Sequence, residues 1–301
     1  MKNRQRTIIH IGLPRAASTF FQRHIFPQIA GFKAFGPAIT EYHPSFTHLL
    51  YADDSAYDPA LIQAWKSEQG DQSMLLSNEL FCGRSHLQAS ANRAAVASRL
   101  KQHWPESEIV LFLRNQVDLL QSLYAIDTYA GMRAKPEQYL QFGSSPPAAD
   151  SAYEWAGSWN YQALISLYRS HFDNVRVYLF EDFVADRDSF LADFKRDLDI
   201  EVSASRTASS GNNASLGASQ IRALQRLNRF KSFVEKSKFG ESLFRKVVQQ
   251  IEHRWPGGAR FEFSNELKQR IADHFRESNQ QLASKLGAGI SANFDRFYLK
   301  P

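Results

Sequence analysis

Residues 8–26 carry the clearest pattern in the chain: Ile8-Ile9-His10-Ile11-Gly12-Leu13-Pro14-Arg15-Ala16-Ala17-Ser18-Thr19, followed by Phe20-Phe21-Gln22-Arg23-His24-Ile25-Phe26. An apolar, β-branched run stops at glycine and proline, and small and hydroxyl residues then open a segment with helically spaced apolar side chains. This pattern predicts a strand, a tight loop and the N-terminus of a helix. Such a junction directs unpaired backbone N–H groups and the positive end of the helix dipole at one place, so it suits a phosphate or sulfate group. An ordinary buried strand with a capped helix is the alternative that this stretch leaves open.

The loop that follows this strand has the residue types that an anion needs. Ala16 and Ala17 are small enough to let the backbone approach a ligand closely. Arg15, Ser18 and Thr19 add side-chain donors to the backbone N–H groups. The sequence therefore predicts that this loop binds an anion.

The composition is that of a globular protein, with 301 residues of which 43% are hydrophobic and 22% are charged. We expect one α/β domain over residues 1–301, with residues 206–301 as a mostly helical C-terminal extension. No apolar run reaches the ~18 residues that cross a bilayer, and the N-terminus lacks the apolar core of a signal peptide, so we expect a cytoplasmic protein. Cys82 is the one cysteine, which excludes an intrachain disulfide, and we expect it to pack in the core.

Positive charge is concentrated between Gln220 and Arg254. This segment has nine Lys or Arg and three Glu, a net charge of +6, whereas the whole chain has +5. The basic residues alternate with apolar ones at mostly helical spacing. A solvated helical face, an anionic acceptor and an acidic membrane surface all fit this pattern, so peripheral membrane contact is one candidate role of the segment. A nucleic-acid partner is not expected, because no recognition motif accompanies these residues.

A carboxylate follows the short apolar run from Ser73 to Ser77, which predicts a strand. In an open parallel sheet, ligands gather beyond the C-terminal ends of the strands. Glu79, two positions after this strand, would therefore point into the same crevice as the first loop, and it is a candidate general base. A carboxylate that caps the next helix is the alternative interpretation of this position.

The run from Glu108 to Leu113 predicts the clearest buried strand of the chain, and Arg114 follows it at once. An arginine in this place needs solvent or an anion for its guanidinium group. Ser122 comes eight residues later, on a predicted helix, where its hydroxyl could join Arg114 at a phosphate. A serine that is merely tolerated in the helix is the alternative.

Three further side chains are candidate substrate contacts. Trp155 and Trp159 follow a Gly-Ser-Ser-Pro-Pro cluster at residues 143–147, and their rings could stack on a sugar or cover the core. His43 lies within residues 31–51, where glycine, proline and the lack of periodicity predict a loop that frames a pocket.

These motifs together resemble the sulfotransferases that use 3′-phosphoadenosine 5′-phosphosulfate (PAPS). The 5′-phosphosulfate loop of that family commonly reads Pro-Lys-x-Gly-Thr-Thr, and Pro14-Arg15-Ala16-Ala17-Ser18-Thr19 is similar to it. The stretch from Leu113 to Tyr124 resembles the family's 3′-phosphate signature, a strand that ends in Arg with a Ser in the next helix. Phe180-Glu181-Asp182-Phe183 and the segment from His274 to Gly287 resemble later parts of the family's sequence.

Two loop residues depart from the family's pattern. Arg15 stands where Lys is usual, and it keeps the charge while offering a forked rather than a point-like cation. Ala17 stands where Gly is usual, and its β-carbon disfavours a positive φ, so either the loop does not need that conformation or it is distorted. The likeness is weakest over residues 31–71 and 206–258.

The resemblance implies a P-loop-like, three-layer α/β/α fold with a central parallel sheet. It also implies an enzyme that transfers a sulfuryl group from PAPS to an acceptor hydroxyl or amine, with adenosine 3′,5′-bisphosphate as the product. Residues 14–19 would hold the 5′-phosphate and the sulfate, and Arg114 and Ser122 the 3′-phosphate. Arg15 and Glu79 would be catalytic, with Glu79 as the general base.

No metal ion is expected, because His43, His48, His86 and His103 lack a compact ligand spacing and arginines can neutralise the charge of the donor. For a bacterial-type member, the leading hypothesis for the acceptor is a glycan or glycoconjugate, because the aromatic and basic residues suit a sugar that is already anionic. The sequence leaves the oligomeric state and the sulfation position open.

Two rival functions stay open. A P-loop kinase or NTPase would share the strand, loop and helix, but it should show Gly-x-x-x-x-Gly-Lys-Ser/Thr, and this chain has Arg at position 15 and lacks those glycines. A catalytically weak nucleotide- or glycan-binding module would keep Arg114 and Ser122 and lose the transfer machinery.

Overall fold

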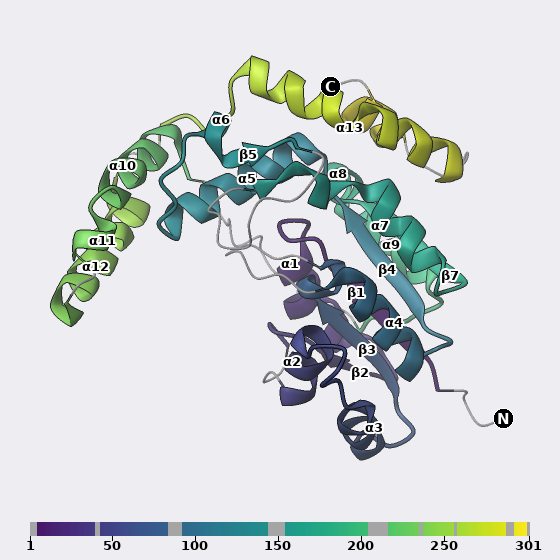
Figure 1. Ribbon diagram of the computed structural model, residues 1–301. Helices are drawn as coiled ribbons and strands as arrows, with labels where there is room; N and C mark the ends of the chain where they lie inside the picture. Colours follow the sequence, from purple (N-terminus) through teal and green to yellow (C-terminus); the bar gives the residue numbers. More distant parts are fainter. Residues whose placement is uncertain are drawn as a thin grey trace.

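A parallel sheet forms the centre of the structure (Figure 1). The computed structural model describes residues 5–39, 43–83, 92–143, 154–203, 216–234, 237–255, 258–286 and 292–299. The strands are β1 (Thr7–Ile11), β2 (Phe32–Phe35), β3 (Ser73–Asn78), β4 (Glu108–Leu113) and β7 (Asn174–Leu179), in the order β2-β3-β1-β4-β7. All neighbouring pairs are parallel. Because β1, β3 and β4 are buried almost throughout, both faces of the sheet need a cover of helices.

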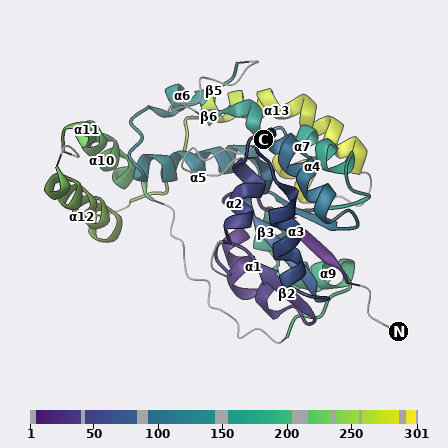
Figure 2. The same cartoon turned by 60° about the horizontal axis from the view of Figure 1, so that its bottom comes forward.

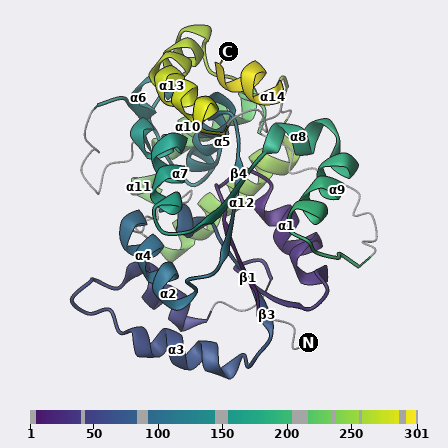
Figure 3. The ribbon, with the colours of Figure 1, turned by 90° about the vertical axis from the view of Figure 1, so that its right-hand side faces the viewer.

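Helices cover both faces of this sheet (Figure 3). On one face lie α1 (Ser18–His24), α8 (Phe180–Ala185) and α9 (Arg187–Asp197). On the other face lie α4 (Arg93–His103) and α7 (Tyr161–Arg169). The predicted three-layer α/β/α fold with a central parallel sheet is thereby confirmed.

Aromatic rings fill the space between the sheet and the helices α1 and α9. The ring of Phe21 on α1 lies 4.5 Å from that of Phe112 on β4, centre to centre. The ring of Phe194 on α9 lies 5.4 Å from Phe21 and 5.9 Å from Phe112. Offset and edge-to-face pairs of this kind stabilise a core beyond the area that they bury. They fix α1 on the sheet, and with it the loop that leads into α1.

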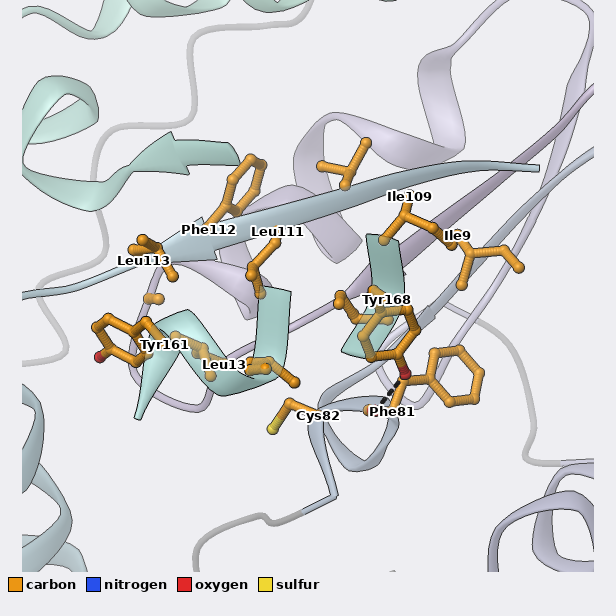
Figure 4. Close-up of a cluster of buried hydrophobic side chains, with 14 of the residues drawn as sticks. Ile9, Leu13, Phe81, Cys82, Ile109, Leu111, Phe112, Leu113, Tyr161 and Tyr168 are labelled. Carbon is orange, nitrogen blue, oxygen red and sulfur yellow. Dashed lines mark hydrogen bonds between the residues drawn. The ribbon is translucent and has the colours of Figure 1, made fainter. Parts of the chain in front are cut away.

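Aliphatic and tyrosine side chains fill the opposite face, under α7 (Figure 4). Ile9 of β1 and Leu111 of β4 are fully buried there. The Tyr168 hydroxyl donates a hydrogen bond of 2.5 Å to the backbone carbonyl of Phe81, in the turn that follows β3. This contact ties α7 to the turn that carries Glu79.

Residues 31–51 contradict the prediction of a loop, because they contain β2 and the helix α2 (Pro44–Tyr51). β2 pairs with β3, and Phe46 of α2 packs 5.0 Å from the Trp65 ring of α3. Such short elements are stabilised by neighbours distant in sequence, which local periodicity does not reveal. The remaining elements before residue 200 are η1 (Phe26–Gln28), α3 (Pro59–Glu68), η2 (Glu79–Cys82), α5 (Gln116–Tyr129), α6 (Pro136–Tyr139), β5 (Leu140–Gln141), β6 (Glu154–Trp155) and η3 (Ala156–Trp159).

The predicted C-terminal extension divides into two parts, as far as it is described; residues 204–215 lie outside the described ranges. The helix α13 (Asn265–Leu286) packs on α5 and α7 and adds apolar residues to the main core, and α14 (Ala292–Phe294) and η5 (Asp295–Leu299) follow it. In contrast, α10 (Ala218–Asn228), α11 (Lys231–Val234) and α12 (Lys238–Arg254) stand beside α5, away from the sheet (Figure 2). They enclose a small apolar cluster of their own. Among the described helices, none has the length and apolar character needed to cross a membrane.

Candidate functional site

The predicted site residues follow three adjacent strands of the sheet. β1 lies between β3 and β4. The strands β2 and β3 lie on one side of β1, and the later strands β4 and β7 lie on the other, so the strand order reverses at β1. The crevice at such a reversal is where open parallel sheets bind ligands. Arg15 follows β1, Glu79 follows β3 and Arg114 follows β4, so all three residues lie at the same edge of the sheet.

The loop between β1 and α1 contains two left-handed residues that are not glycine. Arg15 has a φ of 65° and Ala17 has a φ of 63°. The sequence left open whether position 17 needs a positive φ, and the structure shows that it does. This conformation costs an L-residue about 1–2 kcal/mol, and strain of this kind gathers at ligand clamps. Left-handed residues within a turn direct successive N–H groups toward one side, which forms a concave site for an anion.

Ala17→Gly is expected to stabilise the fold by about 0.5–1 kcal/mol, measured by urea unfolding. Glycine adopts a φ of 63° without a β-carbon clash, and this gain exceeds the entropy that glycine adds to the unfolded chain. Ala16→Gly is the matched control and should destabilise the fold, because Ala16 has no positive φ. A loss of stability in Ala17→Gly would contradict the presence of strain.

Arg114 and Ser122 are joined to this loop by hydrogen bonds. A terminal guanidinium nitrogen of Arg114 donates to the backbone carbonyl of Arg15 over 2.7 Å. The Nε of Arg15 donates to the Oγ of Ser122 over 2.9 Å. The residues predicted for a 5′-phosphosulfate and those predicted for a 3′-phosphate are thus in direct contact.

Arg114 is 9% exposed and has an unused donor. Its guanidinium carbon lies 4.8 Å from the centre of the Phe180 ring, and its Nε has no hydrogen-bond partner among the described residues. Burial lowers the pKa of Arg114, but a guanidinium group stays charged at neutral pH. Because a buried donor without a partner costs free energy, this group is suited to bind an anion.

Glu181 holds the backbone that carries Arg114. Its carboxylate accepts hydrogen bonds from the Asn115 N–H over 2.7 Å and from the Tyr298 hydroxyl over 2.9 Å. The Tyr161 hydroxyl donates to the backbone carbonyl of Arg114 over 2.6 Å. Burial raises the pKa of Glu181. Glu181 of the Phe-Glu-Asp-Phe motif therefore positions the start of α5.

Glu79 opens the turn η2, which its neighbours hold in place. Asn78, and not Glu79, caps this turn, because its side chain accepts a hydrogen bond from the Leu80 N–H over 2.9 Å. The thiol of Cys82 donates to the backbone carbonyl of Glu79 over 2.9 Å. Cys82 is fully buried, as predicted, and also helps to position Glu79.

Burial raises the pKa of Glu79 to about 7, although the charge of Arg15 acts in the opposite direction. For Arg15 the two effects are reversed, because burial lowers its pKa and the charge of Glu79 raises it. The two charges thus lie within electrostatic reach of each other. A carboxylate whose pKa lies near neutral pH is well matched to general base catalysis.

The hydroxyl residues of the loop differ in what they offer a ligand. Ser18 is buried, and its hydroxyl donates to the backbone carbonyl of Leu13 over 3.0 Å, which closes the loop. Ser18 therefore offers an anion its backbone N–H rather than its hydroxyl proton. Thr19 is exposed, whereas Pro14 and Ala16 are buried beneath the loop surface.

The three candidate substrate contacts are not equally accessible. Trp159 is 1% exposed, so it covers the core and we withdraw it as a substrate contact. Trp155 is half-buried, and its Nε1 donates to the backbone carbonyl of Gly143 over 2.9 Å. His43 is exposed and caps α2 by accepting a hydrogen bond from the Ser45 N–H over 3.2 Å. Trp155 and His43 keep surface that a substrate can reach.

Arg260 is a cation near the site that the sequence did not single out. Its charge lowers the pKa of Arg114, and its guanidinium group lies 3.9 Å from the Asp118 carboxylate. A cavity of about 600 Å³, a size typical of small-molecule sites, opens at the N-terminal end of α5. Its polar lining includes Asn115, Asp118, Gln121, Arg260, Lys268 and Arg296. Arg260 follows glycine and alanine in a stretch without helical or strand periodicity, so the sequence offered no signal for it.

The arrangement combines two chemical capacities. The loop N–H groups and the guanidinium groups of Arg15 and Arg114 can bind a polyanion, and Glu79 can accept a proton beside it. In the part of the chain that the structure covers, no group of three or more His, Cys, Asp or Glu is placed to hold a metal ion.

Comparisons with known proteins found structural similarity alone. No protein-family model matches the chain, and no curated protein does. The chain is similar to a sulfotransferase from Alicyclobacillus acidocaldarius, with a TM-score of 0.41 and 14% identity over 81% of this chain and 99% of that one. It is also similar to the mouse sulfotransferase SULT7A1, solved in complex with PAP, with a TM-score of 0.39 and 14% identity over 92% of this chain and 86% of that one.

Proposed function

We propose that this protein transfers a sulfuryl group from PAPS to a hydroxyl or amine of an acceptor, and that the acceptor is a carbohydrate. The main support is the pair of hydrogen bonds that joins Arg15 to Ser122 and Arg114 to the Arg15 carbonyl. These bonds place two strand ends suited to anions in one crevice. PAPS has an anionic group at each end of its ribose, so it matches two such sites that lie side by side.

The residues at the ends of β1 and β4 are suited to bind PAPS, which is negatively charged at both its 5′ and 3′ positions. The loop over residues 14–19, with its two left-handed positions, would hold the 5′-phosphosulfate. Arg114, whose Nε is unused, and the hydroxyl of Ser122 would hold the 3′-phosphate. Arg260 adds a third positive charge to this end of the site.

In the proposed mechanism, Glu79 accepts the proton of the acceptor hydroxyl while the acceptor oxygen forms its bond to sulfur. The donor supplies the sulfuryl group, and cleavage of its bond from sulfur to the bridging phosphate oxygen leaves adenosine 3′,5′-bisphosphate. Arg15 stabilises the negative charge that the bridging oxygen gains with the bonding electrons. The raised pKa of Glu79, about 7, suits the role of base.

The carbohydrate acceptor rests on the half-buried Trp155 and the exposed His43, whose rings offer surface to a sugar. The test is a panel of glycans, lipids and tyrosyl peptides incubated with labelled PAPS. We expect label on glycans. Label on peptides or lipids alone would overturn this part of the proposal. Donor binding without label on any acceptor would favour a nucleotide-binding module instead.

The donor site is tested by calorimetric binding of adenosine 3′,5′-bisphosphate to the wild type and to Arg114→Ala. We expect the substitution to weaken binding by about 1.5–3 kcal/mol, the contribution of hydrogen bonds to a charged group. Arg169→Ala is the control, because Arg169 is exposed at the end of α7 and has no role in the site. This variant should bind like the wild type.

ADP, and ATP with magnesium, are measured alongside to test the rival functions. Selective binding of the 3′,5′-bisphosphate supports a sulfotransferase. Tighter binding of ATP would move the protein to the kinase class, and no binding of any nucleotide would overturn the proposed function.

A further inference from the structure

The helical arm, which we define as residues 216–234 and 237–255, is fastened to α5 and exposes its other side (Figures 1 and 2). The side-chain amide of Asn228 donates to the backbone carbonyls of Thr128 and Met132 over 2.7 and 2.9 Å. These bonds are buried, so the arm has a defined attachment to the end of α5. One side of α10 faces that attachment, and the opposite side faces solvent.

The exposed side of α10 is a row of arginines. Arg222, Arg226 and Arg229 are all exposed, and their spacing of four and three residues places them on one helix face. No ion pair with a described acidic residue neutralises any of them. The two acidic residues of the arm that are described have other partners: Glu241 pairs with Arg245, and Glu252 accepts a hydrogen bond from the hydroxyl of Tyr129. The arginine row therefore keeps its full positive charge.

Large apolar side chains are exposed on the same helical arm. Phe230 is 63% exposed and directly follows Arg229, and Leu243 and Trp255 are 49% and 52% exposed. These are three of the six large apolar side chains that are exposed in the described part of the chain. The transfer of exposed apolar groups from water into hydrocarbon is favourable. The arm thus offers both positive charge and apolar contact area.

We propose that the helical arm docks on an anionic lipid surface through the arginine row and Phe230. Arginine side chains are attracted to anionic headgroups, and an adjacent aromatic ring inserts at the boundary of headgroups and acyl chains. An anionic glycan would satisfy the arginines but would leave Phe230, which is 63% exposed, in water, so the charge and the exposed ring together favour lipid. This inference goes beyond sulfuryl transfer and does not depend on it.

The test is cosedimentation of the full-length protein with vesicles of phosphatidylcholine alone or mixed in equal parts with phosphatidylglycerol. We expect binding to the mixed vesicles only, weakened by salt. The triple variant Arg222→Glu, Arg226→Glu, Arg229→Glu should bind at least about a hundredfold more weakly, because each lost arginine charge accounts for about fivefold and each new carboxylate is repelled by the surface. Phe230→Ser should weaken binding about tenfold through lost apolar contact.

A matched variant controls for net charge. Arg169→Glu, Lys195→Glu, Lys285→Glu changes the charge equally at exposed positions outside the arm, and it should bind like the wild type. Equal weakening in this control, or no binding of the wild type, would overturn the proposal. Retention of the wild type on heparin but not on vesicles would also overturn the proposal, and it would assign the arm to a glycan. Urea unfolding of each variant confirms folding, and binding of adenosine 3′,5′-bisphosphate reports on the donor site separately.

Discussion

Glu79→Gln is expected to lower turnover by a factor of about 10²–10⁴, the usual contribution of a general base. The amide keeps the size of the side chain but cannot accept the acceptor's proton. Asn78 and Cys82 contribute hydrogen bonds that hold its turn, and both are kept in the variant. The measurement is steady-state transfer of labelled sulfate from PAPS to an acceptor that the panel identifies. Affinity for adenosine 3′,5′-bisphosphate should stay at the wild-type value.

The dependence of turnover on pH distinguishes a lost base from a disturbed site. Because Glu79 has a pKa of about 7 and must be ionised to act, wild-type kcat/KM should fall about tenfold per pH unit below that value. The residual activity of Glu79→Gln should show no such fall. Turnover equal to the wild type in the variant would remove Glu79 as the base.

The same substitution should affect stability in the opposite direction. The folded protein holds the Glu79 proton up to about pH 7, whereas the unfolded chain releases it near 4.5, so the wild type loses stability as the pH rises between these values. The loss is of the order of 3 kcal/mol, at about 1.4 kcal/mol per unit of pKa. Glutamine does not titrate. The advantage of Glu79→Gln in unfolding free energy should therefore grow from pH 4.5 to 7 and level off above.

Arg15→Ala is expected to lower kcat by a factor of about 10²–10³. Arg15 stabilises the charge that develops on the leaving oxygen, and the loss of one such donor typically has an effect of this size. Alanine accepts the left-handed φ of 65° as well as arginine does, so the backbone of the loop should not change. Single-turnover measurements with labelled PAPS separate this loss of kcat from weaker donor binding.

Arg15→Lys is the matched control for Arg15→Ala. Lysine keeps the positive charge that stabilises the leaving oxygen, so it should restore most of kcat. It loses the Nε that donates to Ser122, so the restoration should not be complete. Arg15→Ala should also move the pH profile to higher pH, because the charge of Arg15 lowers the pKa of Glu79. An unchanged kcat in Arg15→Ala would place Arg15 outside the transfer step.

Parallel strands and their end residues were predictable because a strand buried on both faces needs a continuous apolar run, which is visible in the sequence itself. β1, β3 and β4 confirm this. The edge strand β2 was missed, since its four residues are stabilised by pairing with β3 rather than by a pattern of their own. The burial of Trp159 was not predictable for a similar reason, because the residues that pack around it in the core lie outside its own segment.

The order of residues alone determined that an arginine follows β1, that a carboxylate follows β3, and that an arginine and a serine eight residues apart follow β4. It also predicted that these ends meet at one edge of a parallel sheet. Only the tertiary structure decided the positive φ of Ala17, the bond from Arg15 to Ser122 and the role of Glu181. The last two are hydrogen bonds between residues 107 and 66 positions apart, which only the packing of distant segments brings together. The pKa of Glu79 was decided in the same way, because the loss of water around a carboxylate depends on everything folded against it.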